Sequence, residues 1–151
     1  MLRDDINNAL KEAMKARDER RVSTLRMVNA AIKDRDIEAR GLGKGPLSDE
    51  ELLGLFQKMI KQRQDSVEAY QKGGRADLVT QENEEIAIIS SYLPKQMSED
   101  EMKAAIAAAI KETGAASMKD MGKVIGALRG KYAGQMDFGK ASGLVKGMLA
   151  G

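Results

Sequence analysis

Breaks between amphipathic stretches constrain the fold of this chain more than any other feature. Apolar residues recur every three or four positions in seven successive stretches, which are separated by glycines, prolines or polar runs. The loop GLGKGP at 41–46 and Pro94 are two such breaks. Ser48 and Ser98 are each followed three residues later by a glutamate, as in a helix capping box. No segment of useful length alternates with the period of a strand, so the pattern predicts an all-α fold.

The predicted helices fall into two groups. The stretch PKQMSED after Leu93 indicates a joint, which predicts an N-terminal four-helix domain at 1–93 and a small three-helix C-terminal domain at 97–151. The first four predicted helices end near Arg17, near Arg40, at Gly73 and at Pro94, and the last three begin at the caps Ser98, Ser117 and Asp137. About 55 residues is near the lower limit for a domain that folds alone.

The composition excludes several classes of function. The chain has no cysteine, histidine or tryptophan, which removes disulfides, thiolate chemistry and the commonest zinc ligands. No apolar run approaches the roughly 20 residues that a membrane-spanning helix needs. The N-terminal sequence MLRDDINNALKEAMKARDERR carries acids and no apolar core, unlike a signal peptide. We therefore expect a soluble cytoplasmic protein with no membrane, metal or cofactor.

Glycine recurs every fourth residue in the last two predicted helices, at 122, 126, 130 and 134 and again at 139, 143, 147 and 151. Each glycine inside a helix costs about 1 kcal/mol relative to alanine. At 100° per residue, the first stripe borders the apolar face of its helix and the second lies opposite. The stripes allow either a close helix crossing or a surface of bare backbone. The second interpretation is stronger for the last helix.

Positive charge is concentrated in the same region. Residues 113–151 contain six Lys or Arg and two Asp, whereas residues 82–112 contain three and seven. Bare backbone with lysines at its margins and helix N-terminal amides nearby suits a large, stiff polyanion. Five aromatic residues offer few platforms for stacking bases, so the pattern favours recognition of folded RNA by shape and backbone.

Three segments resemble the YqeY-like family: KQRQDSVEAYQKGGRADLV at 61–79, SYLPKQ at 91–96, and SMKDMGKVIGALRGKYAGQMDFGKASGLVKGML at 117–149. That family shares a tail domain with the B subunit of tRNA-dependent amidotransferases, and the resemblance covers essentially the whole chain. It implies an all-helical, two-part protein. It also implies that the C-terminal part corresponds to the domain that contacts tRNA in the amidotransferase, without its glutaminase or transamidation chemistry.

The resemblance also assigns candidate residues. Gly122 and Lys123 lie within the motif MKDMGKVIGAL, and Gly139 and Lys140 match a DGK sequence that this chain interrupts with Phe138. Together with the charge pattern, this predicts an RNA-binding set of Lys119, Gly122, Lys123, Gly126, Arg129, Gly139, Lys140, Gly143 and Lys146.

No constellation of residues predicts catalysis. Ser90 and Ser91 lack the glycine-rich context of an amidase, and GLGKGPLS lacks the spacing of a phosphate-binding loop. The acids at 82–85 are typical of a solvated helix face, and Arg63, within an apolar stripe, is expected to pair with an acid.

The leading interpretation is a noncatalytic module that binds or associates with tRNA or another structured RNA. The first alternative is a protein-interaction module that docks on an amidotransferase or aminoacyl-tRNA synthetase assembly. A weaker alternative is a part in a glutamine-dependent carbon–nitrogen ligase activity. The sequence leaves the oligomeric state and the particular RNA or protein partner open.

Overall fold

The computed structural model describes residues 1–150, and the all-α prediction is confirmed for them. Within this range the chain forms seven α-helices and one turn of 3₁₀ helix (η1), with no strand. The elements are α1 (Leu2–Ala16), α2 (Glu19–Gly41), α3 (Asp49–Lys72), α4 (Ala76–Ser90), α5 (Glu99–Thr113), η1 (Met118–Asp120), α6 (Met121–Tyr132) and α7 (Phe138–Ala150). The breaks between them fall where glycine, proline and capping residues predicted them.

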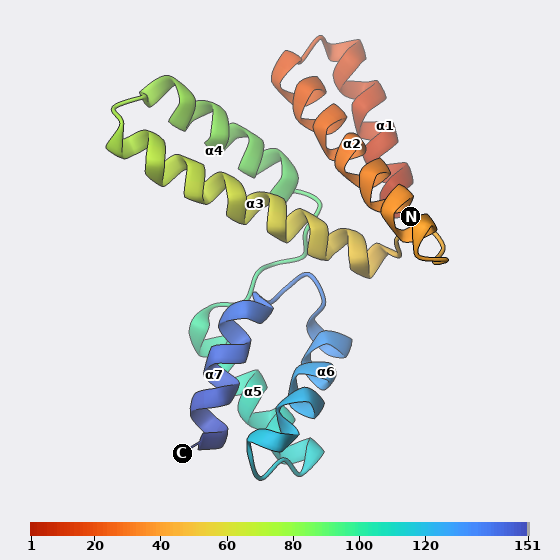
Figure 1. The fold of residues 1–151 in the computed structure, drawn as a ribbon. Helices are drawn as coiled ribbons and strands as arrows, with labels where there is room; N and C mark the ends of the chain where they lie inside the picture. The colour runs from red at the N-terminus through yellow and green to blue at the C-terminus, as the bar shows by residue number, and fades with distance from the viewer. Residues whose placement is uncertain (151) are drawn as a thin grey trace. The chain divides into compact units, whose positions relative to one another are not determined.

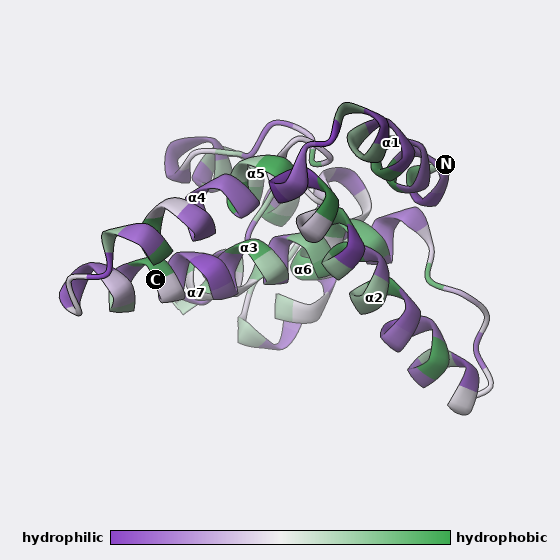
Figure 2. Cartoon of the chain, turned by 90° about the horizontal axis from the view of Figure 1, so that it is seen from above, coloured by the Kyte–Doolittle hydropathy of each residue, from purple (hydrophilic) through white to green (hydrophobic). Residues whose placement is uncertain are grey.

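Contacts divide the chain into two compact units, one at Met1–Leu93 and one that begins at Pro94. Each unit has a separate hydrophobic core. Green and purple alternate along individual helices in Figure 2, as expected when each helix buries one face and exposes the other. That the units are independent domains, at 1–93 and 97–151, stays a prediction.

The first unit consists of two helical hairpins. α1 packs on α2, α3 packs on α4, and α2 joins the pairs by its contact with α4 (Figure 1). Sharp chain reversals separate the helices: Arg17 takes a left-handed conformation with φ 56°, and Asp18 then caps α2 by accepting a hydrogen bond from the Arg21 N–H. The largest fully buried side chains at the centre are Ile6, Leu25, Leu52, Phe56 and Ile89.

Two ion pairs between helices reinforce this core. The Arg63 guanidinium lies 3.1 Å from the Glu85 carboxylate and also donates to the Met59 carbonyl, so the predicted pairing of Arg63 is confirmed. Both side chains are nearly buried, at 13% and 10% exposure. Near the start of the chain, Arg3 donates to both carboxylate oxygens of Asp36, at 2.6 and 2.7 Å. These pairs fix α3 to α4 and α1 to α2.

The second unit packs α5, α6 and α7 around one core, whose largest fully buried side chains are Ile106, Leu128, Met136, Val124 and Val145. α6 and α7 run in opposite directions and are joined by residues 133–137 (Figure 1). Gly134 lies buried in that turn with φ 78°, a conformation that side chains rarely adopt. In the part of the chain that the structure describes, no helix is both long and apolar enough to cross a membrane.

The start of α6 differs in detail from the prediction. Ser117 and Asp120 form a capping box, but the box closes η1, and α6 begins only at Met121. The Asp120 carboxylate turns back to accept from the N–H groups of Ala116 and Ser117. The first turn has 3₁₀ geometry, which is frequent at helix N-termini, before the α-helix continues.

The Arg63–Glu85 pair generates the first prediction. Arg63→Ala leaves the Glu85 carboxylate buried without its partner, which should lower the free energy of unfolding by about 3 kcal/mol. The double variant Arg63→Met with Glu85→Leu should recover most of that loss. Urea denaturation measures both effects. Arg75→Met, which breaks the exposed Arg75–Asp77 pair, is the control and should change little; an equal loss in the control would contradict the prediction.

The Arg3–Asp36 pair predicts a pH dependence. Hydrogen bonding to Arg3 lowers the pKa of Asp36, with further lowering by the Leu47 N–H. Because the folded-state pKa lies below the unfolded one, the stabilisation is complete above the unfolded pKa and is lost as pH falls through the folded pKa. Asp36→Asn should therefore be less stable than wild type at neutral pH, and the difference should shrink as the pH falls below the unfolded aspartate pKa of about 3.9. A stability difference that stays constant over this range would rule out the assignment.

Candidate nucleic-acid interface

The glycines of α6 and α7 lie on the surface. Gly122, Gly126, Gly143 and Gly147 are all exposed, and no atom beyond the local helix backbone lies within 4 Å of the position that a Cβ atom would take. Gly130 has the same open surroundings, whereas a Cβ at Gly139 would lie 3.2 Å from Asp137 Oδ1. None of these six glycines therefore serves a close crossing of helices in the described residues, which removes that interpretation for α6.

The core positions show why the stripes are bare. α6 buries Val124 and Leu128, and α7 buries Ala141 and Val145. At 100° per residue, each glycine stripe lies on the side of its helix away from these residues. In a three-helix unit the outward sides of two helices face different directions, so the glycines form two bare ridges on a convex surface. This convexity has no counterpart in the sequence pattern, which shows each stripe only on its own helix.

The predicted cations come from elements that touch one another. α6 packs against α7, and η1 contacts both. All five predicted cations are exposed, and none of them forms an ion pair within residues 1–150; they are Lys119, Lys123, Arg129, Lys140 and Lys146. Another cation of α6, Lys131, is paired with Glu112 of α5 at 3.3 Å. The positive charge of η1, α6 and α7 is thus mostly uncompensated by nearby carboxylates.

Arg129 has a fixed position that sequence reasoning missed. Its guanidinium carbon lies 5.6 Å from the centroid of the Phe138 ring, a cation–π arrangement between α6 and α7. Phe138 is the first residue of α7 and packs against the core of the second unit. The extra residue in the DFGK sequence therefore anchors the start of α7 and positions Arg129. A phenylalanine directly after a capping aspartate is the signal that could have indicated this role.

The helix N-termini are not open anion sites. Asp137 Oδ1 accepts hydrogen bonds from the N–H groups of Gly139 and Lys140, at 2.9 and 3.2 Å. At the other helix start, backbone hydrogen bonds from Ala116 and then Ser117 lower the pKa of Asp120, with Lys123 adding to the effect. The Asp137 carboxylate therefore occupies the first amides of α7. The Asp120 carboxylate places a negative charge at the start of η1, where it accepts from two amides that precede the helix. The glycines can give an anion close approach, and the lysine and arginine side chains must supply the hydrogen bonds.

The other acidic and nucleophilic candidates have structural partners. Glu85 pairs with Arg63, and Glu84 pairs with Arg20 of α2 at 3.0 Å. Burial raises the pKa of Glu82, and the Glu85 carboxylate raises it further. Ser91 Oγ donates to the Ile88 carbonyl at 2.6 Å at the end of α4. Over residues 1–150, no group of three or more acidic side chains is arranged to hold a metal ion.

Comparison with curated proteins finds relatives that match part of the chain. A protein of Lachancea thermotolerans named "Altered inheritance of mitochondria protein 41, mitochondrial" is 40% identical over 89 residues, which are 59% of this chain and 46% of that protein. Proteins of the same name from Vanderwaltozyma polyspora and Saccharomyces cerevisiae are each 36% identical over 84 residues, 56% of this chain and 44% of theirs. The matched stretch thus spans less than half of each of these relatives.

These relatives contradict the predicted cytoplasmic localisation, because they are named as mitochondrial proteins. The prediction rested on the absence of cysteine and of an apolar leader. The absence of cysteine does not identify a compartment, because such a chain has no thiols on which a reducing or an oxidising environment could act.

A comparison with protein families covers nearly the whole chain. Residues 3–149 match the family described as Yqey-like protein, so the match includes α3 and α4 as well as the glycine-bearing helices. The resemblance carried by the segments at 61–79, 91–96 and 117–149 is therefore confirmed. The chain belongs to the YqeY-like family.

Proposed function

We propose that the second unit is a noncatalytic module that binds tRNA or another folded RNA through η1, α6 and α7. The observation that supports this most directly is the open space around Gly122, Gly126, Gly143 and Gly147. These glycines lower helix propensity without giving any packing contact in return. The loss of helix stability is explained if a partner must approach the helix backbone closely.

The charge of the surface favours an anionic partner. Five exposed cations without ion pairs lie on η1 and on the two helices that carry the glycines, whereas Asp120 and Asp137 are engaged with backbone amides. A convex surface with bare ridges fits the wide, shallow minor groove of an RNA helix better than a flat platform would. In such a complex the lysines contact phosphates, and the glycine backbone lies against the ribose edge. tRNA is the preferred class because the family resembles the tRNA-contacting tail domain of amidotransferases.

One observation favours the alternative of a protein partner. Met118 on η1 and Met148 on α7 are 40% and 39% exposed, and exposed methionines suit contacts with other proteins. Under this alternative, binding depends on apolar contact and on the bare ridges more than on the lysines. The two variants described next separate it from RNA binding.

Charge reversal tests the role of the lysines. Lys123→Glu should weaken binding to a tRNA transcript about tenfold and make the dependence of log affinity on log salt shallower, because a phosphate contact is lost. The control is Lys103→Glu on α5, an exposed lysine of the same unit, which should leave affinity unchanged. Fluorescence anisotropy at several salt concentrations measures both. Equal affinities for wild type and Lys123→Glu would exclude this site for RNA.

Adding a side chain tests the bare ridges. Gly143→Leu should weaken tRNA binding because it holds the RNA away from the helix, while the helix itself folds normally. Gly54→Leu is the matched control, since Gly54 is also an exposed helical glycine with open surroundings but lies on α3. If Gly143→Leu abolished capture of a protein partner and left RNA affinity intact, the protein-docking alternative would replace the proposal.

The same glycines predict an effect on stability. Gly126→Ala and Gly143→Ala should each raise the free energy of unfolding by about 1 kcal/mol, because alanine has the higher helix propensity and its methyl group meets no neighbour. Thermal and urea denaturation measure the gain. A loss of stability in either variant would show that the glycine has a packing role, and would remove the main support for the proposed surface.

A further inference from the structure

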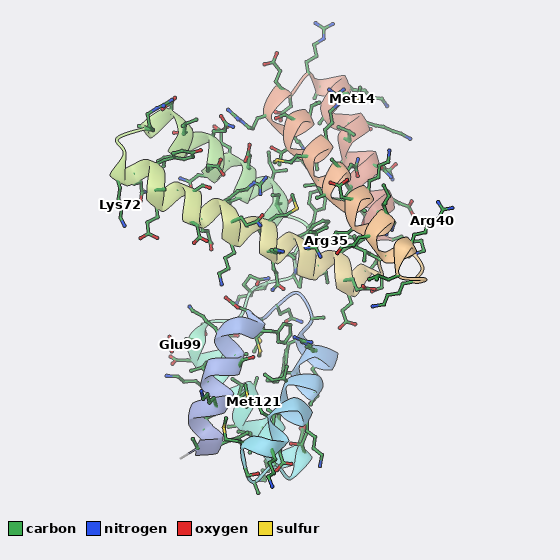
Figure 3. All side chains as sticks on the ribbon, in the orientation of Figure 1. Met14, Arg35, Arg40, Lys72, Glu99 and Met121 are labelled. Carbon is green, nitrogen blue, oxygen red and sulfur yellow. The ribbon has the colours of Figure 1, made fainter. Side chains whose placement is uncertain are left out.

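Arg129 is held in one place on the surface of the second unit. It lies in the last turn of α6, at the opposite end of that helix from Met121, which Figure 3 labels. Its side chain is exposed, yet its guanidinium carbon lies over the ring of Phe138, 5.6 Å from the ring centroid. A long exposed side chain ordinarily samples many rotamers. The contact with the ring restricts this motion, so Arg129 presents its guanidinium in a defined place.

The ring that supports Arg129 is itself fixed. Phe138 is half-buried and packs against the core of the second unit. Its backbone is bound as well, because the Phe138 carbonyl accepts a hydrogen bond from Ser142 Oγ at 2.8 Å. The preceding residue, Asp137, caps the first turn of α7. Arg129 therefore rests on a part of the fold and not on another mobile side chain.

Glycines of α6 border Arg129 on one side. At 100° per residue, Gly126 and Gly130 lie about 60° and 100° around the helix from Arg129. Ile125 and Tyr132, which pack against the core, lie around the helix in the other direction. A Cβ atom at either glycine would meet no atom within 4 Å. The side chain of Arg129 is thus bordered by apolar side chains on one side and by bare backbone on the other.

A guanidinium in these surroundings favours a planar aromatic partner. Arginine stacks on aromatic rings and on nucleobases because its guanidinium is planar, delocalised and weakly hydrated. The Phe138 ring already restricts the rotamers of Arg129, so a second stacked ring costs less conformational entropy than it would on a free arginine. No carboxylate competes for the group, since Arg129 forms no ion pair within residues 1–150. The N–H groups along its edge can donate to a phosphate at the same time.

We propose that Arg129 is a platform on which one unpaired base of the bound RNA stacks. This inference rests on the proposed function and adds to it the class of RNA, which is a helix that carries an unpaired nucleotide. The base of that nucleotide leaves the helix and stacks on the guanidinium, while neighbouring phosphates contact the lysines. Within a fully paired helix, each base is covered by its neighbours and is not available to Arg129. Because stacking tolerates any base, the preference is for an unpaired base and not for a sequence.

The first experiment compares the binding of the full chain to two RNA hairpins of equal length and charge. One hairpin carries a single bulged adenosine, and the other carries an abasic nucleotide at that position, so that only the base differs. Wild type should bind the adenosine hairpin about tenfold more tightly, as expected for one stacked base. Fluorescence anisotropy at a fixed salt concentration measures both affinities. Equal affinities overturn the inference and leave the proposed function standing, whereas binding to neither hairpin overturns both.

Substitutions assign the preference to the two residues of the platform. Arg129→Lys keeps the charge and removes the planar group, so the ratio of the two affinities should fall toward one. Phe138→Leu keeps an apolar side chain against the core and removes the ring, so it should lower the ratio as well. The control Lys123→Ala should weaken binding to both hairpins by the same factor and leave the ratio unchanged. Circular dichroism establishes that the variants keep their helices. A ratio that survives Arg129→Lys excludes Arg129 as the platform.

Nuclear magnetic resonance gives a readout of stacking that does not depend on affinity. The Nε–H resonance of Arg129 can be identified by its absence from the spectrum of Arg129→Lys. This resonance should shift when the adenosine hairpin is added, because the ring current of the stacked base acts on it. The abasic hairpin should shift it much less. Equal shifts with the two hairpins would show that the base does not lie against Arg129.

Discussion

Burial of one apolar face per helix is the constraint on which both units depend. The chain has few aromatic residues, and medium-sized aliphatic side chains and methionine supply most of its buried surface. Small cores of this kind tolerate little loss. In the first unit the Arg63–Glu85 pair lies beside the core and is shielded from water, so it joins α3 to α4 where the apolar stripe is interrupted. In the second unit, three short helices share a single cluster around Ile106 and Leu128.

The same constraint separates the proposed binding surface from the core. α6 and α7 each bury apolar side chains on one face, Val124 and Leu128 on α6 and Ala141 and Val145 on α7, which leaves the opposite face free to carry glycine. A helix that buried residues on several sides could not present bare backbone in this way. The stability of the second unit must therefore come from the cluster and from its caps, among them Ser98, Ser117 and Asp137, and not from the intrinsic propensity of α6 and α7.

Most of the fold could be predicted from the sequence because its signals are local. Capping boxes, glycine breaks and helical periodicity act within a few residues, and they placed all seven helices. The glycines of the candidate site could be found in the same way. The surroundings of these glycines could not be predicted, because the exposure of Gly126 depends on which residues of other helices approach it. The contact of Arg129 with Phe138 likewise joins two helices and has no local signature.

The expectation that the helix N-terminal amides are available to phosphate was wrong for α7. A cap that satisfies the first amides of a helix also removes them as ligands, and Asp137 does this for the amides of Gly139 and Lys140 at the start of α7. The remaining donors at this surface are flexible side chains. In the proposed complex with RNA, such groups follow the spacing of phosphates and not the identity of bases.

The exposed helical glycines have a consequence for how the sequence of this chain evolves. Nearly every replacement of glycine by another residue, apart from proline, raises the propensity of a helix to form. Random drift would therefore fill positions 122, 126, 143 and 147 wherever no opposing demand acts, since nothing around them resists a larger group. The residues at these four positions in distantly related proteins thus record whether the exposed main chain is used or merely tolerated.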